Sequence, residues 1–471
     1  MFSSKILHAT AAALSVAMLS GPALADEMVY GPFPITVKGY DGSKTNSVSY
    51  TGQVARHTLH DSLKVLAGKG NGKPNADLKA QMMSYFEGKD AGRDILAPTS
   101  KGSFKIKQTK VDDISKKKNL AGKTFGGAIT GMPNAMTGAE LVSFWIDKAS
   151  AADGGQDTAN GYDYPQLISK FVMGAVFYNQ VVDGYLDENL EADKKPNDKP
   201  YGEGAAYTGK EHSWDEGFGY FGAPAHTLKL SPADVYDIAK RKDDALAKAD
   251  FNKDGVVDLK SEMVFGPAYY AAGADKGGKT NYLHTITKAF LDGRKLLANA
   301  KGEKLSDAQR AELKGYAKVV ADNWQLVLAE ATFKYAGSVY KDLAKLQTIM
   351  EANGDTDKAL KTYIKHWGEL KGFALALQTG KDNLGETATR LNRMIGFGPL
   401  LPNRSQVVDV DKDGNYLRDQ GVSWGEYMLH MAKVQKLLID EFGVKARASD
   451  VTGDMKDLAG KLGGKASAEN D

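Results

Sequence analysis

The sequence contains no cysteine among its 471 residues, so neither disulfides nor a lipid anchor on an N-terminal cysteine can be part of this protein. Lysine and arginine total 61 against 59 aspartate and glutamate residues, and this balance does not favour a nucleic acid or a polyanionic substrate as partner. The zinc-peptidase motif His-Glu-x-x-His is also absent. Of all residues, 42% are hydrophobic and 25% are charged, which is typical of a globular protein.

A long apolar run occurs only at the start of the chain. Lys5 precedes a mostly apolar stretch at 6–19, and Ala23-Leu24-Ala25 supplies a small-x-small site. These are the features of a cleaved secretory signal peptide, and the run is too short to favour a permanent membrane span. We expect cleavage near Ala25 and a periplasmic mature protein without a membrane span.

Hydrophobic periodicity predicts a mainly α-helical protein. Residues 29–50 are rich in β-branched and aromatic residues and predict a short N-terminal β-hairpin. Helical spacing then predicts a helix of 27 residues from Tyr164, another after a capping box at Ser306 and Gln309, and a further one at 424–442. The expected organisation is a signal peptide at 1–25, an N-terminal half of short strands and a helical bundle at 26–230, a helix with an EF-hand-like loop at 231–270, a C-terminal helical bundle at 271–445 and a C-terminal tail at 446–471.

The clearest chemical motif is DFNKDGVVDLKSE at 250–262. A hard cation needs several oxygens that converge on one point, and alternate positions of a tight loop supply them, with Gly255 at the sharp turn. Position 12 of the loop is Ser261, so the closing acid comes one residue late. The motif predicts a structural Ca²⁺ site, and an acidic turn without metal is the alternative. The expected ligands are Asp250, Asn252, Asp254, Val256, Asp258 and Glu262.

A weaker copy of this motif begins at Asp409. Gly414 stands at the turn position, but the second half of the motif matches only if about six residues, 415–420, are looped out. The segment is therefore interpreted either as a cation site or as an acidic turn. Its expected ligands are Asp409, Asp411, Asp413 and Glu426.

Each half of the chain also carries a helix with histidine, aromatic residues and an acid. In EHSWDEGFGYFG at 211–222 the polar residues share a face away from the aromatic ones, and KHWGELKGF at 365–373 places its histidine beside an apolar face. If the two helices face each other, they can hold iron or zinc in a shared cavity. The alternative is two hydrogen-bonded pairs in the core. The predicted metal or ligand site consists of His212, Asp215, Glu216, His366 and Glu369.

A third group, His57, His60 and Asp61, stands at positions i, i+3 and i+4 of a predicted helix that ends at Gly68. This group matches none of the metal or catalytic patterns considered above. We expect these three side chains to lie on the protein surface without a functional role.

Five segments together resemble an uncharacterised family of bacterial cell-envelope proteins that is similar to the imelysin-like group. They are SVSYTGQVAR, YPQLISKFVMGAVFYNQVVDGYL, EHSWDEGFGYFG, HWGELKGFALALQ and RMIGFGPLLPN. The resemblance implies two related helical bundles, export from the cytoplasm, and either periplasmic metal uptake or peptidase activity. In the Gly-x-His-x-x-Glu motif of that group, the histidine falls on His212 and the acid on Asp215, with Glu216 next, whereas Lys210 replaces the glycine.

The expected function is that of a periplasmic divalent-cation-binding protein in metal acquisition or envelope homeostasis. Ca²⁺ is the expected ion of the 250–262 loop, iron or zinc are further metals, and a cell-envelope protein is a partner. One alternative is a metal-dependent peptidase with Glu216 or Asp215 as its base. The other is a structural envelope protein whose His–acid pairs lock the helices. The sequence features favour a binding or structural protein over an enzyme, and we assign no catalytic residue.

Overall fold

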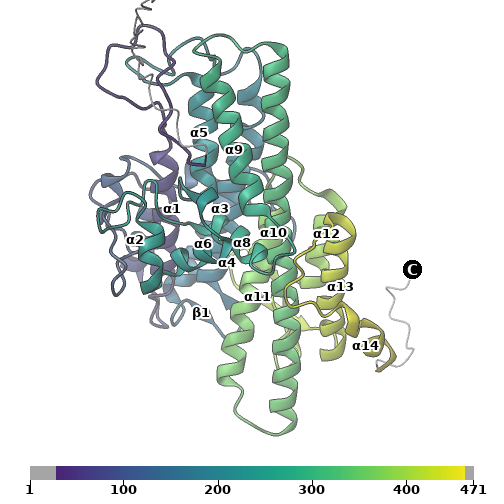
Figure 1. Ribbon diagram of the computed structural model, residues 1–471. Helices are drawn as coiled ribbons and strands as arrows, with labels where there is room; N and C mark the ends of the chain where they lie inside the picture. The colour runs from purple at the N-terminus through teal and green to yellow at the C-terminus, as the bar shows by residue number, and fades with distance from the viewer. Residues whose placement is uncertain (1–27, 462–471) are drawn as a thin grey trace, which may run out of the picture.

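The computed structural model describes residues 28–461, and the predicted signal peptide lies outside the described residues. Helices dominate the described chain, as predicted, and none of them combines the length and the apolar character that crossing a bilayer requires (Figure 1). The α-helices are α1 Thr51–Ala67, α2 Ala76–Phe86, α3 Gly138–Ala151, α4 Tyr164–Val172, α5 Gly209–Phe221, α6 Pro232–Lys240, α7 Leu246–Ala249, α8 Gly266–Asp275, α9 Tyr282–Asn299, α10 Asp307–Glu351, α11 Asp357–Leu377, α12 Gly385–Ile395, α13 Trp424–Phe442 and α14 Met455–Lys461.

The 45-residue helix α10 is the spine of the fold. Its predicted start is confirmed, because the Ser306 hydroxyl accepts a hydrogen bond from the Gln309 amide and the Gln309 side chain accepts one from the Ser306 amide. At 1.5 Å per residue this helix is about 67 Å long. Helix α9 packs beside one half of it and α11 beside the other, while α13 also packs on it (Figure 1).

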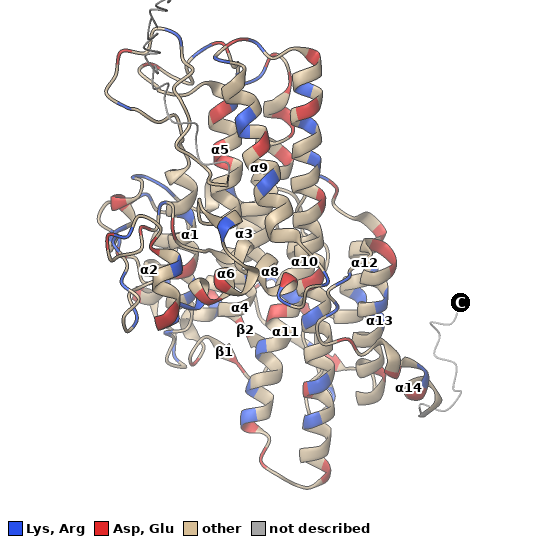
Figure 2. Cartoon of the chain, in the orientation of Figure 1, with Lys and Arg blue, Asp and Glu red and all other residues tan. Residues whose placement is uncertain are grey.

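Buried apolar side chains from Tyr30 to Val444 form one connected core. Helix α11 packs on α4, and α9 packs on α5, so helices from both halves of the chain contribute to it. The predicted domain boundaries stay predictions, because one core that both halves share does not divide the chain into separate domains. Basic and acidic residues are interspersed along α10 and α11 rather than separated by sign (Figure 2).

The predicted N-terminal β-hairpin is wrong, because residues 29–50 contain no strand. The Tyr30 ring instead stacks on Phe218 of α5 with 3.8 Å between centroids, and the Ser49 amide donates to Asp215 at 2.9 Å. The partner of this segment is therefore a helix. The strands of the described chain lie elsewhere, in two antiparallel pairs: β1 Gln156–Asp157 with β2 Tyr162–Asp163, and β3 Ser405–Val410 with β4 Tyr416–Gln420.

The long helix predicted from Tyr164 is present, but its second half is wider than an α-helix. It continues after α4 as π-helical turns at Met173–Tyr178 and Val181–Tyr185. At the first of these turns the Phe125 amide, from a neighbouring loop, donates to the Ala175 carbonyl at 2.7 Å. A donor from outside the helix takes this carbonyl out of the regular ladder, a common cause of local distortion.

Part of the predicted C-terminal tail at 446–471 is folded. The Glu330 carboxylate accepts hydrogen bonds from the Ala446 and Arg447 amides at 2.7 and 3.0 Å, and Gln435 accepts one from Val451 at 2.8 Å. Helix α14 follows. The rest of the predicted tail, residues 462–471, lies outside the described residues.

Two helical glycines predict opposite effects of alanine. A Cβ at Gly293 of α9 would lie 2.1 Å from Trp214 Cζ2, and that ring is fixed by a hydrogen bond from its nitrogen to the Phe290 carbonyl. A Cβ at the exposed Gly315 of α10 meets nothing within 4 Å. We expect Gly293→Ala to lower the free energy of unfolding by about 1–3 kcal/mol, and Gly315→Ala to raise it by about 0.5–1 kcal/mol. Urea denaturation measures both, and shifts of the same sign would contradict this packing.

Candidate functional site

Glu211 and Asp215 of α5 bind an arginine that sequence reasoning missed. Arg294 of α9 donates from Nη1 to Glu211 Oε1 and from Nε to Asp215 Oδ1, both at 2.9 Å. All three side chains are fully buried. Asp215, which the sequence placed in a metal cavity, therefore helps Glu211 to hold α5 against α9.

The N-terminal segment completes this Arg294 cluster. The Tyr30 hydroxyl donates to Asp215 Oδ1 at 2.7 Å, and Arg294 Nη2 donates to the Ser47 hydroxyl at 2.6 Å. Burial raises the pKa of Asp215, an effect that Arg294 opposes. Burial alone would lower the pKa of Arg294, but Asp215 and Glu211 raise it, so the guanidinium stays charged.

His212 and Glu216 lie together on a less buried side of α5. His212 Nε2 is 3.7 Å from Glu216 Oε1, and its ring packs on Tyr201 and Tyr207 with 4.1 and 4.8 Å between centroids. Gln53 also donates to Glu216 Oε1 at 2.6 Å. Burial lowers the pKa of His212, which favours the neutral imidazole.

His366 and Glu369 have partners of their own. His366 Nδ1 lies 2.6 Å from Asp342 Oδ2 of α10, whereas Glu369 accepts a hydrogen bond from the Tyr335 hydroxyl at 3.0 Å. Within residues 28–461 no group of three or more histidine and acidic side chains is arranged to hold a metal ion. The five residues predicted to share a cavity thus enter separate sets of contacts, and metal binding by them stays a prediction.

The 250–262 loop contains a turn that is held by hydrogen bonds to its acidic side chains. Asp250 Oδ1 accepts from the Asp254 amide at 3.0 Å and Oδ2 from the Gly255 amide at 2.9 Å, while Asp254 Oδ1 accepts from Val256 at 3.1 Å. Gly255 has φ +86°, a conformation that glycine adopts without strain. The loop backbone is therefore folded around its own acidic side chains.

Glu262 and Lys107 complete the surroundings of this loop. Glu262 Oε2 accepts from the Asp258 amide at 2.8 Å, and its pKa is raised first by burial and then by the charge of Asp250. The Lys107 ammonium lies 3.4 Å from Asp254 Oδ2 and 3.8 Å from Asp258 Oδ2. The protein's own lysine thus lies beside two of the predicted Ca²⁺ ligands.

The second acidic segment forms the turn of the β3–β4 hairpin. Asp411 Oδ1 accepts hydrogen bonds from the Asp413 and Asn415 amides at 2.9 and 2.8 Å, whereas Asp409 Oδ1 accepts from the next amide in the chain. Glu426 accepts instead from the Ser423 amide at 2.8 Å and caps α13. Because Glu426 serves a helix end, the arrangement fits the acidic-turn interpretation.

Gly421-Val422-Ser423-Trp424-Gly425 matches the Gly-x-Ser-x-Gly pattern of serine hydrolases, which the search of the sequence for motifs missed, and it stands where β4 leads into α13. Those enzymes place the serine on a strained turn. Ser423 has an ordinary extended backbone, φ −66° and ψ 157°, and its hydroxyl accepts from the Glu426 amide. This serine is a helix cap.

His57 and His60 are buried, so their interpretation as surface residues is wrong. His57 Nε2 lies 3.1 Å from the Gly219 carbonyl, and His60 Nε2 lies 2.9 Å from the Ser169 carbonyl. Burial lowers the pKa of His57 to about 3. Helix α1 packs against α2, α4 and α5, which leaves little of its surface exposed. The next residue, Asp61, lines a pocket.

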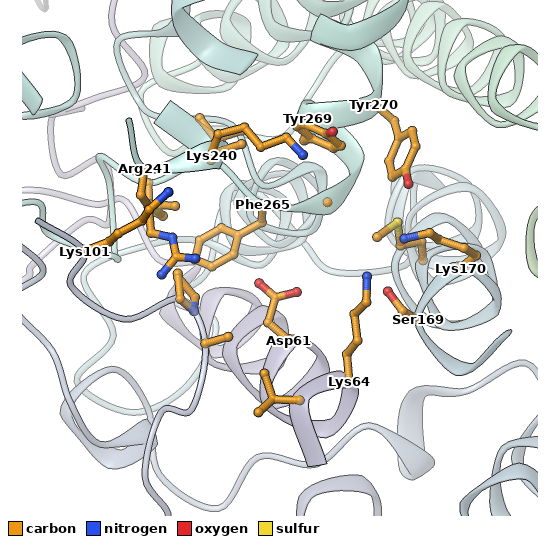
Figure 3. Close-up of a pocket in the computed structure, with 18 residues that line it drawn as sticks. Asp61, Lys64, Lys101, Ser169, Lys170, Lys240, Arg241, Phe265, Tyr269 and Tyr270 are labelled. Atoms are coloured by element: carbon orange, nitrogen blue, oxygen red, sulfur yellow. The ribbon is translucent and has the colours of Figure 1, made fainter. Parts of the chain in front are cut away.

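This basic pocket has a volume of about 450 Å³ and lies between α1, α4, α6 and α8 (Figure 3). Aromatic and apolar side chains, including Phe265 and Tyr269, form one part of its wall. Asp61 is the single carboxylate in a lining that holds five basic residues. They are Lys64, Lys101, Lys170, Lys240 and Arg241.

The inner end of the basic pocket contains two lysines and a carboxylate behind them. Lys170 Nζ lies 3.7 Å from Glu369 and 5.5 Å from the centroid of the Tyr270 ring. Burial, together with the neighbouring Lys170 ammonium, lowers the pKa of Lys64 to about 7. Glu369, predicted as a metal ligand, thus serves as the counter-charge of a buried lysine.

Residues 150–245 match the model of a family described as Domain of unknown function (DUF4856). The matched region covers less than half of the chain and runs from the end of α3 through α6, so it includes α5, Lys170 and Lys240. No curated protein and no solved structure matches the chain. These comparisons give no link to the imelysin-like group.

Proposed function

We propose that the protein is an exported, divalent-cation-binding protein of the cell envelope, similar to the imelysin-like group, with a structural Ca²⁺ site in the 250–262 loop. Its role is in metal acquisition or envelope homeostasis. The observation that supports this proposal is the hydrogen bonding of Asp250, which folds the loop backbone around the acidic side chains. A carboxylate oxygen has more than one lone pair, so one that accepts an amide hydrogen bond can still bind an ion.

The loop joins three parts of the chain. Val257 pairs with Ile106 in a parallel bridge, in which Lys107 N donates to the Val257 carbonyl at 3.0 Å. The Ser261 carbonyl accepts from the Ala225 amide at 2.7 Å. An ion bound to the native loop and not to the unfolded chain would stabilise all three segments at once.

Charge also favours a bound cation. The 13 residues of the loop include four carboxylates. In the described chain two of them, Asp254 and Asp258, form ion pairs with Lys107. The carboxylate ligands, the Asn252 oxygen and the Val256 carbonyl are the hard oxygen donors that Ca²⁺ prefers. Lys107 would then compete with the ion for Asp254 and Asp258.

The experiment is a thermal melt of the mature protein with EGTA or with Ca²⁺ at about 1 mM, a concentration at which many extracellular loops of this type are filled. We expect Ca²⁺ to raise the melting temperature, by an amount equivalent to about 2.7 kcal/mol if the ion is at 100 times its dissociation constant. Lys107→Met is expected to strengthen Ca²⁺ binding, because it removes the competing ammonium. Isothermal titration calorimetry measures that affinity.

Two double variants test the site. Asp250→Asn with Asp254→Asn should lose the Ca²⁺ shift, whereas the matched pair Asp411→Asn with Asp413→Asn, in the β3–β4 turn, should keep it. An unchanged melting temperature in the wild-type protein, or an equal shift in the first double variant, would refute the proposal.

The structural alternative has one observation in its favour, namely the Arg294 cluster, in which the acids of α5 lock two helices together. Elemental analysis separates it from metal acquisition. Copurified iron or zinc supports acquisition, and Ca²⁺ alone supports a structural role. The contacts of the two candidate bases do not favour the peptidase, because Asp215 is bound to Arg294 and Glu216 to Gln53.

A further inference from the structure

The basic pocket collects its charge from separate elements. Lys64 comes from α1, Lys170 from α4, and Lys240 with Arg241 from the end of α6 (Figure 3). Figure 3 shows the Lys64 and Lys170 nitrogens directed toward the same space. Since these residues are distant in sequence, the fold rather than a local charge run brings them together.

The two carboxylates near the pocket are fewer than the five basic residues that line it. Asp61 Oδ1 lies 2.9 Å from His60 Nδ1, and Glu369 accepts from the Tyr335 hydroxyl at 3.0 Å. Lys170 shares Glu369 at 3.7 Å, but within residues 28–461 neither Lys64 nor Arg241 forms an ion pair with a carboxylate. The cationic charge of the pocket is thus only partly neutralised by the protein.

Part of the wall is aromatic. Lys240 Nζ lies 5.1 Å from the Tyr269 ring centroid, and the Tyr269 hydroxyl donates to Tyr236 at 3.2 Å, which fixes the ring. Phe265 lies beside it in the lining. A volume of about 450 Å³ is within the usual range of small-molecule sites, about 300–1,000 Å³.

We propose that the basic pocket binds a small organic anion. Lys64, Lys170 and Arg241 hold its carboxylate or phosphate group, and its apolar or aromatic body packs on Phe265 and Tyr269. Arg241 Nη1 already donates to the Thr99 carbonyl at 2.6 Å, so its guanidinium is held at the rim. This site is distinct from the 250–262 loop and does not depend on Ca²⁺ binding there.

The probe is pyridoxal 5′-phosphate, an aromatic anion with an aldehyde group. The neutral amine of Lys64 adds to the aldehyde carbon, and loss of water leaves an imine, which borohydride reduces to a stable secondary amine. Because the pKa of Lys64 is about 7, a large fraction of this amine is neutral at pH 7, whereas exposed lysines with pKa values near 10.4 are almost fully protonated. Tryptic peptides analysed by mass spectrometry locate the modified lysine.

We expect Lys64 to be the main labelled lysine and to react about tenfold faster with pyridoxal 5′-phosphate than with pyridoxal, which lacks the phosphate; tenfold corresponds to about 1.4 kcal/mol. Phenyl phosphate and benzoate, added separately, should protect Lys64, and their relative effect tells a phosphate ligand from a carboxylate ligand. The same series in EGTA separates this result from any failure at the loop.

Lys240→Gln with Arg241→Gln removes two charges at the rim and should reduce the preference for the phosphorylated probe, although Lys64 and Lys170 remain. The matched pair Lys318→Gln with Lys436→Gln removes two exposed charges elsewhere and should leave the preference intact. Labelling spread over exposed lysines, equal rates with both probes, or no protection by either anion would overturn the proposal.

Discussion

Replacing Arg294 with methionine is expected to lower the free energy of unfolding by about 3–5 kcal/mol, because the change leaves two buried carboxylates without their cation. Glu211 and Asp215 are fully buried, and Arg294 contacts each at 2.9 Å. Urea denaturation near neutral pH measures the loss. The loss should shrink as the pH falls from neutral toward about 4, because burial raises the pKa of carboxyl groups that lack a counter-charge, so they take up protons in the folded state before they do in the unfolded chain.

Charge removal provides the control for this prediction. The triple variant Arg294→Met, Glu211→Gln, Asp215→Asn has no buried charge in the cluster and should recover part of the lost stability, since isolated charge is the main cost. Arg294→Lys keeps one charge but cannot reproduce the forked contacts of a guanidinium, so it should fall between the wild type and the methionine variant. A loss under about 1 kcal/mol for the methionine variant would contradict the structure.

A second large effect concerns Lys371 of α11, which is buried without an acidic partner. Its ammonium donates to Asn392 Oδ1 at 2.9 Å and to the Gly396 carbonyl at 2.8 Å, and burial lowers its pKa to about 7. In the unfolded chain the pKa of lysine is about 10.4. Between these two values the unfolded state binds the proton more tightly, so this residue makes stability rise with pH across the window from about 7 to 10.

At about 1.4 kcal/mol for each unit of pKa difference, Lys371 can contribute about 4–5 kcal/mol over that window. Lys371→Met should remove this dependence. The measurement is the free energy of unfolding of both proteins at about pH 7.5 and 9.5. Lys64 and the buried tyrosines are common to both proteins and cancel in the difference. Parallel pH profiles for the two proteins would show that Lys371 is not the source.

The helices could be predicted where periodicity and caps agree. Ser306 and Gln309 marked the start of α10, and the predicted helix at 424–442 coincides with α13. The prediction of an N-terminal hairpin was wrong for a physical reason. Residues 29–50 have strand-like composition, but β propensity describes a half-buried surface and not the identity of the partner, which here is α5.

The sites were harder to predict because their members meet only in three dimensions. The acids of α5 were visible in the sequence, but Arg294 lies 79 residues beyond Asp215 in a helix with ordinary periodicity. The basic pocket follows no motif, since its cations come from different elements. One hint was present: Lys170 stands in an otherwise apolar stretch, where a charge needs a partner or a ligand.

The Arg294 cluster also has a consequence for the order of folding. Ser47 and Arg294 are separated by 247 residues, and Tyr30 and Asp215 by 185. A ribosome therefore completes the segment at 29–50 long before it makes the helix that must receive it. The part of the chain that is synthesised early is fixed late, because Asp215 and Arg294, which bind its tyrosine and serine hydroxyls, are made only afterwards.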